Sequence, residues 1–385
     1  MFSLYIHIPF CKKICDYCDF HVLPASEKLF QEYSDLVCRE IELYEKKYPG
    51  TLKTAETLYL GGGTPSMLPS DCLGQIFACL QSVGVDISRL REVSMEFNPE
   101  STSRETIENA LELGVKRFSL GLQTFNPELL KRIGRSHSVE AGVDALELLL
   151  GYPDIRVSGD LMFSLPGQTL DVFLSDVNRL SDYPLTHISF YGLTVNPRTI
   201  LGQKVQKGIF EIDEDLYEPM YQGGVELLDG KGFKRYEVSN FAKPGFESIH
   251  NQNYWRRGEY AGFGPGAHSY VGNRRFYAPE IYPRWRDYVR NGAPENLLTI
   301  DELSEDDILM ELFWLSLRQS SGLDLQELGK MGYKLPETAL TKWLKHNYLQ
   351  VEGSPEITGI RLRDRGWIFM DDIVTDLANQ CSKLE

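Results

Sequence analysis

The chain has 385 residues, of which 42% are hydrophobic and 25% charged, and its formal net charge is −15. This composition is typical of a soluble globular protein with one large domain and a smaller one. The acidic balance argues against nucleic acid as a partner, because a nucleic-acid-binding surface needs clustered basic residues.

The start of the chain carries no targeting pattern. The first residues, MFSLYIHIPFC, lack the charged region and the cleavage site of a signal peptide. No apolar run in the sequence reaches the length of a membrane-spanning helix. We therefore expect a cytoplasmic protein without a transmembrane segment.

The first half of the chain alternates between two patterns. Short apolar, β-branched segments predict six strands, at residues 4–10, 56–62, 92–98, 117–123, 156–166 and 187–194. Helical patterns lie between them, at residues 27–47, 69–82, 103–113, 126–150 and 169–182. Strands that alternate with helices predict a parallel α/β fold, either an open sheet or a barrel.

The regular alternation of strand and helix patterns ends after about residue 205. A helix is predicted at 213–230 and a strand at 233–242, and residues 243–275 are rich in glycine, asparagine and aromatics. That composition predicts a loop, and a long loop of this kind is often part of a site. We therefore expect a core at 1–205 and an extension at 206–295.

Residues 296–385 form a predicted third region. Three helical patterns precede two short strand patterns, LQVEG and GIRLRD, and a last helix follows them. Helices that end in a hairpin predict a small α+β, winged-helix-like domain. Its acidic setting favours a structural or protein-contact role over DNA binding.

Three cysteines cluster directly after the first predicted strand. Cys11, Cys15 and Cys18 follow the spacing C-x₃-C-x₂-C, at the strand end where α/β folds place their sites. A tetrahedral zinc site needs four ligands, which His7 or His21 could complete, although the trio lacks the paired spacing of zinc knuckles. An iron–sulfur cube held by three thiols leaves one iron open to a small molecule.

The remaining cysteines are scattered, and we expect small buried hydrophobes or incidental thiols at Cys38, Cys72, Cys79 and Cys381. Other polar or small residues recur at predicted strand ends. GGGTPS follows the second strand, and three glycines let the backbone approach a ligand closely. Polar side chains at or near later strand ends are Glu96, Gln123, Arg135 and Asp160. Each alone is typical of a salt bridge or cap, but together they indicate ligand contact.

The cysteine spacing in this context resembles the radical S-adenosylmethionine (SAM) superfamily. The resemblance implies a partial, TIM-like (β/α)₆ barrel and a [4Fe-4S] cluster on the three cysteines, with SAM at the open iron. It also implies that SAM contacts Gly62, Gly63, Thr64, Glu96, Gln123, Arg135 and Asp160. Tyr5 and Tyr17, which flank or lie within the cysteine loop, are expected near the adenine.

Several segments resemble one branch of that superfamily. YIHIPFC, GGGTPS, RFSLGLQTF, DLMFSLPGQT and HISFYGLT are similar to the branch that holds oxygen-independent coproporphyrinogen III oxidase (HemN) and the heme chaperone family HemW. The resemblance covers about residues 4–278. Phe20 stands where the oxidase has a fourth cysteine, and the first strand begins at residue 4, without the oxidase's long N-terminal extension. Both features favour the chaperone family.

The segment HNQNYW, residues 250–255, matches HNxxYW, which is associated with heme binding in that family. An imidazole is a common heme ligand, so His250 is a candidate, and Tyr254 and Trp255 offer flat faces for a porphyrin. Alternatively, His250 and Asn251 are hydrogen-bonded groups that hold a loop, with the aromatics as its core. His268 is a second candidate ligand.

The sequence departs from the family pattern at two places. Asn196 stands where the family usually has glutamate, and Ser248–Ile249 precede the motif where a cysteine and a basic residue are common. The second departure puts a cysteine-assisted attachment of heme in doubt.

The resemblance implies a heme chaperone that passes heme to acceptor hemoproteins, respiratory ones among them. The cluster and SAM then have a structural or regulatory role, and a homodimer is left open. The alternatives are the oxidase reaction, a radical decarboxylation of coproporphyrinogen III, and a zinc-stabilised interaction protein.

Overall fold

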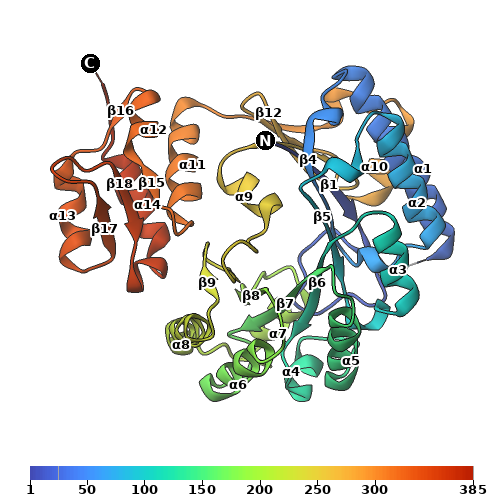
Figure 1. The fold of residues 1–385 in the computed structure, drawn as a ribbon, viewed down its shortest axis with the longest axis horizontal. Helices are drawn as coiled ribbons and strands as arrows, with labels where there is room; N and C mark the ends of the chain where they lie inside the picture. The colour runs from blue at the N-terminus through green and yellow to red at the C-terminus, as the bar shows by residue number, and fades with distance from the viewer. Residues whose placement is uncertain (25, 385) are drawn as a thin grey trace.

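The computed structural model describes residues 1–24 and 26–384. A 12-stranded sheet runs through the molecule in the order β14-β13-β12-β11-β1-β4-β5-β6-β7-β8-β10-β9. The sheet curves, with helices on its outer face, and α9 lies inside the curve (Figure 1). The strands β1 to β8 of this sheet are parallel to one another.

The six predicted strands are present as β1 (Phe2–Ile8), β4 (Ala55–Gly62), β5 (Glu92–Phe97), β6 (Arg117–Gln123), β7 (Arg156–Phe163) and β8 (His187–Gly192). The helices between them are α1 (Glu27–Lys47), α2 (Ser70–Ser82), α3 (Arg104–Glu112), α4 (Pro127–Arg132), α5 (Val139–Leu150) and α6 (Leu170–Ser181). Apolar residues such as Leu4, Ile6 and Ile8 are fully buried beneath the helices. The predicted parallel α/β core is therefore confirmed.

The prediction of a single helix at 126–150 is wrong. Gly134 interrupts it with a φ of +77°, between α4 and α5. A side chain at Gly134 would meet Asp16, which lies in the cysteine loop and donates its backbone N–H to the Ile133 carbonyl at 3.0 Å. The cysteine loop packs at this break, and Ser138 begins α5 as an N-cap that accepts from the Ala141 N–H.

The prediction of a loop at 243–275 is also wrong. This segment forms α9 (Ile249–Trp255) and the strands β11 (Glu259–Phe263), β12 (His268–Val271) and β13 (Arg274–Tyr277). Strand β11 is a seventh parallel strand, because it pairs with β1 on the side opposite β4. The strand expected at 233–242 is two short ones, β9 (Lys234–Arg235) and β10 (Asn240–Ala242).

Other elements complete the middle of the chain. They are the short strands β2 (Phe10–Cys11), β3 (Leu23–Pro24) and β14 (Thr299–Glu302), and the helices α7 (Ile200–Gln206), α8 (Tyr217–Gly230) and α10 (Tyr282–Arg290). None of the helices in the described part of the chain is both long and apolar enough to cross a membrane.

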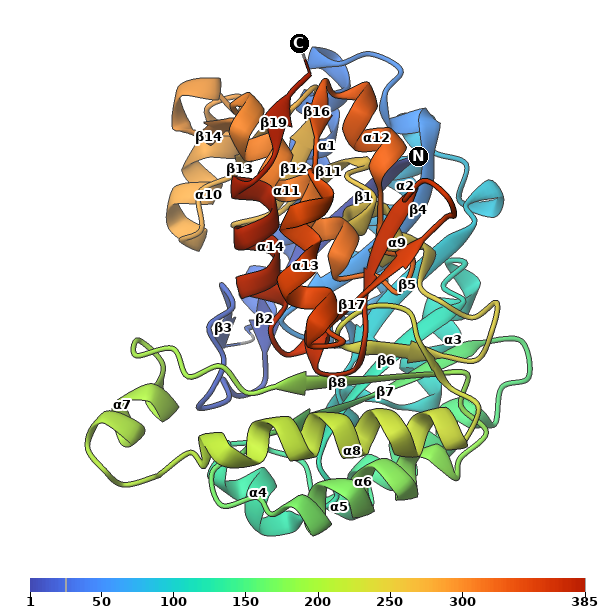
Figure 2. The same ribbon diagram turned by 90° about the vertical axis from the view of Figure 1, so that its left-hand side faces the viewer.

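The C-terminal region contains the predicted helices and hairpin. Its elements are α11 (Glu305–Leu317), β15 (Leu323–Asp324), α12 (Leu325–Lys330), β16 (Tyr333–Lys334), α13 (Glu337–Lys345), β17 (Leu349–Glu352), β18 (Gly359–Leu362), α14 (Met370–Asn379) and β19 (Ser382–Lys383). Ser304 begins α11 with a reciprocal capping box to Asp307. These helices lie across the open side of the curved sheet (Figures 1 and 2).

Candidate functional site

The three clustered cysteines lie on one loop. Cys11 ends β2, and β2 pairs with β3, so the loop between them is closed at its base. Cys15 and Cys18 lie within the loop, where the Cys18 N–H donates to the Cys15 carbonyl at 3.1 Å. All three thiols are free and half-buried.

Burial raises the pKa of the Cys11 thiol, and it raises that of Cys18 to about 11. Iron that binds there must therefore displace thiol protons.

A chain of hydrogen bonds joins two of these thiols through other side chains. Thr64 Oγ1 donates to Cys11 Sγ at 3.7 Å and accepts from Asn98 Nδ2 at 2.6 Å. Asn98 Oδ1 accepts from Arg135 Nη2 at 2.8 Å, and Arg135 Nη1 donates to Cys15 Sγ at 3.6 Å. Donors aimed at sulfur favour the thiolate form and tune an iron–sulfur cluster. Asn98 is not among the site residues that the sequence predicts.

The surroundings do not favour a single-ion site that recruits His7 or His21. Both ring nitrogens of His7 have partners, the hydroxyl of Tyr5 at 3.1 Å and the carbonyl of His21 at 3.0 Å, and His21 pairs with Glu280 at 3.5 Å. Among the described residues, no three His, Cys, Asp or Glu side chains are close enough together for one ion. Three thiols spaced along a loop fit the wider cube of an iron–sulfur cluster.

The glycine segment at the end of β4 packs against the end of β1 and the residues just before the cysteine loop. Gly62 has a φ of +112°, and a Cβ there would lie 2.5 Å from the His7 ring. A Cβ on Gly63 would lie 2.7 Å from the Phe10 carbonyl. Only glycine can lie this close to the neighbouring backbone and the His7 ring. The Gly62 N–H donates to Glu96 at 2.9 Å.

Glu96 lies on β5 beside two stacked tyrosines. It accepts from the hydroxyl of Tyr59 at 2.8 Å, and the Tyr59 ring is stacked with that of Tyr5, 6.2 Å between centroids. Burial raises the pKa of Glu96 to about 7. This carboxyl therefore changes charge near neutral pH.

The other expected site residues lie at the same ends of the parallel strands. Gln123 ends β6 with a φ of +69°, a left-handed conformation that is uncommon for this residue type. Asp160 on β7 accepts from Ser119 at 2.7 Å and from Ser158 at 3.0 Å, and burial raises its pKa. Tyr17 packs with apolar residues of α4 and β7 and also lies near Arg135, Cys15 and Cys18.

Arg135 keeps a free donor in this site. Its Nε is buried without a hydrogen-bond partner among the described residues. An unpaired buried guanidinium N–H suits a carboxylate ligand, such as the one that SAM carries.

The motif HNQNYW forms α9, which is fixed at its N-terminus by one carboxylate. Glu92 accepts from Ser248 Oγ at 3.0 Å and from the backbone N–H groups of Ile249 and His250 at 3.1 and 3.0 Å. Ser248 is also the N-cap, because its hydroxyl accepts from the Asn251 N–H at 3.3 Å. The departure at Ser248–Ile249 thus has a structural role here.

The ring of His250 is buried and engaged at both nitrogens. Nδ1 bonds Thr57 Oγ1 at 2.8 Å, and Nε2 bonds the Tyr254 hydroxyl at 2.8 Å. Burial lowers the pKa of His250 to about 3, so the ring is neutral. His250 thus holds α9 against β4 and orients Tyr254.

Trp255, at the end of α9, contacts the C-terminal region. The Arg318 guanidinium lies 3.8 Å from the centroid of its ring and also pairs with the fully buried Glu237 at 2.8 Å. Gln319 Nε2 donates to the Trp255 carbonyl at 3.0 Å. The motif helix is therefore packed between the barrel and α11.

A cavity of about 550 Å³ opens between α9, the end of β1 and the strands β11 to β13. Its lining residues are Tyr5, His7, Phe20, Gly62, Glu96, Tyr254, Trp255, Arg257, Gly258, Tyr260, Gly266, His268, Tyr270, Arg275 and Leu315. The cavity adjoins the glycine segment and Glu96, and its size is within the roughly 300–1,000 Å³ of ligand pockets. His250 and Asn251 are not among its lining residues.

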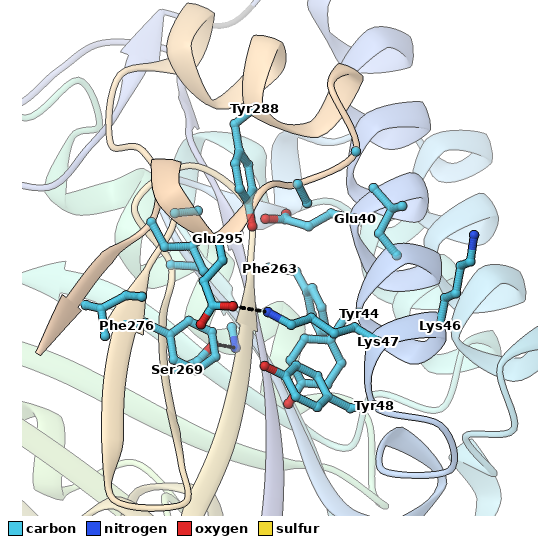
Figure 3. A pocket seen from close by; sticks show the side chains of 18 of the residues that line it. Glu40, Tyr44, Lys46, Lys47, Tyr48, Phe263, Ser269, Phe276, Tyr288 and Glu295 are labelled. Atoms are coloured by element: carbon cyan, nitrogen blue, oxygen red, sulfur yellow. Dashed lines mark hydrogen bonds and ion pairs between the residues drawn. The ribbon is translucent and has the colours of Figure 1, made fainter. Parts of the chain in front are cut away.

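A second cavity, of about 360 Å³, lies on the other face of the same strands (Figure 3). Ser269 and Phe276 point into it, and their neighbours His268 and Arg275 point into the first cavity. No cysteine lines it, and an ion pair of 3.0 Å between Lys47 and Glu295 spans its edge. The first cavity is the candidate site, because it adjoins the cysteine loop and the strand-end residues.

Comparison with known proteins agrees with this geometry. Residues 5–180 match the model of the radical SAM superfamily. The chain is 35% identical to the heme chaperone HemW of Lactococcus lactis, over 83% of this chain and 82% of that one, and 35% identical to HemW of Bacillus subtilis, over 84% and 85%. It is 31% identical to HemW of Mycobacterium tuberculosis, over 98% and 94%.

Among solved structures, coproporphyrinogen III oxidase (HemN) of Escherichia coli, a radical SAM enzyme, superposes with a TM-score of 0.84 at 20% identity, over 98% of this chain and 90% of that one. At that identity the likeness shows the fold. The predicted radical SAM barrel is therefore confirmed.

Proposed function

The chain belongs to the HemW family of the radical SAM superfamily, and from that premise we propose that it is a heme chaperone that binds heme and passes it to acceptor hemoproteins. The observation that carries this proposal is the match to heme chaperones over more than four fifths of the chain. The aromatic cavity beside the cysteine loop supports it, because a porphyrin needs flat apolar walls.

Membership of the radical SAM superfamily implies a [4Fe-4S] cluster and SAM. In our proposal Cys11, Cys15 and Cys18 hold the cluster, which supplies redox chemistry and an open iron for SAM. The donors from Thr64 and Arg135 to sulfur and the free thiols support this assignment.

The proposed SAM-binding residues lie on the strands or at their carboxyl ends, except for Arg135, which follows α4, and Tyr17, which lies in the cysteine loop. Bound SAM would pair its carboxylate with Arg135, whose Nε is without a partner among the described residues, and Glu96 and Asp160 would accept hydrogen bonds from the ribose hydroxyls. The backbone of Gly62, Gly63 and Thr64 borders the ligand. Gln123 completes the polar lining, and Tyr5 and Tyr17 lie near the adenine.

The proposed heme segment is α9. Tyr254 and Trp255 line the cavity, and His250 and Asn251 belong to the same short helix. His250 contributes by orienting the Tyr254 ring through its hydroxyl.

The test is direct binding and transfer. Protein purified and reconstituted without oxygen is titrated with hemin, and we expect saturable binding with a Soret band. Hemin-loaded protein is then mixed with apo-forms of respiratory hemoproteins, with apomyoglobin as a passive scavenger. A chaperone transfers to its acceptors faster than to the scavenger. Non-saturable binding, or one rate for every acceptor, would contradict the proposal.

The second candidate is the oxidase reaction, which the fold shared with HemN favours. Phe20, which is 65% exposed, lines the cavity and stands at the position of the oxidase's fourth cysteine. The protein, with SAM and a reductant, is given coproporphyrinogen III without oxygen. We expect no protoporphyrinogen, and turnover would favour the enzyme over the chaperone.

A further inference from the structure

We propose that His268 is the protein ligand of the heme iron and that Arg257 and Arg275 bind the heme propionates. This inference rests on the proposed function and names the site at which it acts. It places heme in the cavity of about 550 Å³ between α9 and the strands β11 to β13.

The walls of this cavity suit a flat apolar ring. Tyr254 and Trp255 come from α9, Tyr260 and Tyr270 from neighbouring strands, and Leu315 from α11. Tyr254 and Tyr260 meet edge to face, 4.7 Å between centroids, so their planes are fixed relative to each other.

Two histidines line the cavity among the described residues, and they differ in availability. His7 is buried, and both of its ring nitrogens are hydrogen-bonded. His268 is exposed, and its ring makes no hydrogen bond to a described residue. The ring is stacked on that of Tyr277, 4.5 Å between centroids at 23°, which sets its plane and leaves its nitrogens free. His250 is excluded, because Thr57 and Tyr254 occupy its nitrogens.

The lining tyrosines are poorer candidates for the iron. A tyrosine binds heme iron through its phenol oxygen. The Tyr254 hydroxyl bonds His250, and the Tyr270 hydroxyl accepts from Arg257 at 2.6 Å and donates to Asn273 at 2.8 Å. Burial raises the pKa of all four lining tyrosines, Tyr5, Tyr254, Tyr260 and Tyr270, so the phenolate is disfavoured.

The polar wall of the cavity carries an excess of positive charge. Arg257 and Arg275 both pair with one carboxylate, Glu311 of α11. Two guanidinium groups against one carboxylate leave one positive charge, and each group keeps further N–H donors. Heme carries two propionates, which arginine recognises through paired hydrogen bonds.

The experiment is hemin titration of the anaerobically reconstituted protein, read by the Soret band in difference spectra. His268→Ala should weaken hemin binding at least tenfold and shift the Soret maximum, and added imidazole should restore that maximum. His346→Ala is the matched control, because His346 is also exposed beside a tyrosine ring, that of Tyr348 at 5.7 Å, but lies in the C-terminal region. It should bind as wild type does.

Further variants separate the two parts of the inference. His250→Ala should weaken binding through the loss of the Tyr254 contact but keep the wild-type Soret maximum. Arg275→Leu should weaken binding of hemin about tenfold and leave binding of hemin dimethyl ester, which has no free propionates, unchanged. His268→Gln, a polar side chain, replaces His268→Ala if circular dichroism shows that the alanine variant is misfolded.

The outcomes distinguish this inference from the proposed function. Wild-type protein that binds no hemin overturns the function itself. Wild-type protein that binds hemin while His268→Ala or His268→Gln keeps an unaltered Soret maximum overturns His268 as the ligand and leaves the chaperone function intact. Equal weakening of hemin and its dimethyl ester by Arg275→Leu overturns the role of the arginines.

Discussion

Arg135 donates to the side-chain oxygen of Asn98 at 2.8 Å. Through this contact, one asparagine connects a guanidinium that touches Cys15 with a threonine that touches Cys11. The cysteine loop is thus braced by three residues that lie far away in the sequence, after β4, β5 and α4. Partners behind a metal ligand fix its orientation and affect its affinity.

Removal of this brace should make the cluster labile. In Asn98→Ala, Thr64 and Arg135 lose their common partner, so we expect iron to leave roughly tenfold faster in the presence of a chelator. The rate is measured by absorbance without oxygen. Asn178→Ala, an exposed asparagine on α6, is the control. Equal rates in wild type and Asn98→Ala would mean that the brace is irrelevant to the cluster.

The cysteine assignment predicts an all-or-none pattern of iron content. Replacement of Cys11, Cys15 or Cys18 by serine should reduce the iron from about four per chain to near zero, because a cube cannot be held at two corners. Cys381→Ser, a half-buried thiol in the C-terminal region, should keep wild-type iron. Iron and sulfide assays on anaerobic protein decide between these outcomes. Bound zinc in place of iron would contradict the assignment of an iron–sulfur cluster.

Glu40 predicts a pH-dependent loss of stability. It is buried on α1 beside the second cavity (Figure 3), and burial raises its pKa to about 8 from an ordinary value of 4.5. Because the unfolded chain ionises first, the folded state loses stability from about pH 4.5 to pH 8, by about 3–5 kcal/mol. Below pH 4.5 both states are neutral and this loss is absent.

Glu40→Gln should remove that loss. The carboxyl accepts both the Gly264 N–H and the Trp285 Nε1–H through one oxygen, and an amide oxygen can take its place. The variant should therefore match wild type at pH 4.5 and exceed it at pH 9 in chemical denaturation. Glu42→Gln, an exposed residue of the same helix, is the control. A constant difference across pH would contradict the shifted pKa.

The buried pair of Glu237 and Arg318 predicts a large cost for one substitution. Arg318→Ala leaves a fully buried carboxylate without its cation, so we expect a loss of about 3–5 kcal/mol in the free energy of unfolding. The exposed pair of Arg365 and Glu218 also joins the C-terminal region to the barrel, and Arg365→Ala should change stability little. Similar losses in both variants would show that burial is not what matters.

The core strands could be predicted from the sequence because each is a short apolar run that ends in polar or glycine residues. The break at Gly134 has local signals, the glycine and the N-cap Ser138, but its contact with Asp16, more than a hundred residues earlier, cannot be predicted from the local sequence. The strands after residue 255 also depend on distant contacts that the local sequence does not show, because β11 pairs with β1.

The candidate site shows a similar division. The three cysteines of the cluster loop could be predicted, because their spacing is a pattern within eight consecutive residues of the sequence. Asn98 follows Glu96 at a strand end, which is a usable signal, but its partners come from distant segments. Whether His250 or His268 is available depends on burial and on hydrogen bonds, and neither is encoded in the motif.

Two residues of α11, in the C-terminal region, contribute to the cavity. Leu315 lines its wall, and Glu311 pairs with the lining residues Arg257 and Arg275. Occupancy of the cavity and the docking of α11 are therefore thermodynamically linked. Under the proposed function, an acceptor that displaces α11 weakens the binding of heme, and bound heme opposes that displacement by the same free energy. Transfer of heme and displacement of α11 from the cavity are then coupled steps of one equilibrium.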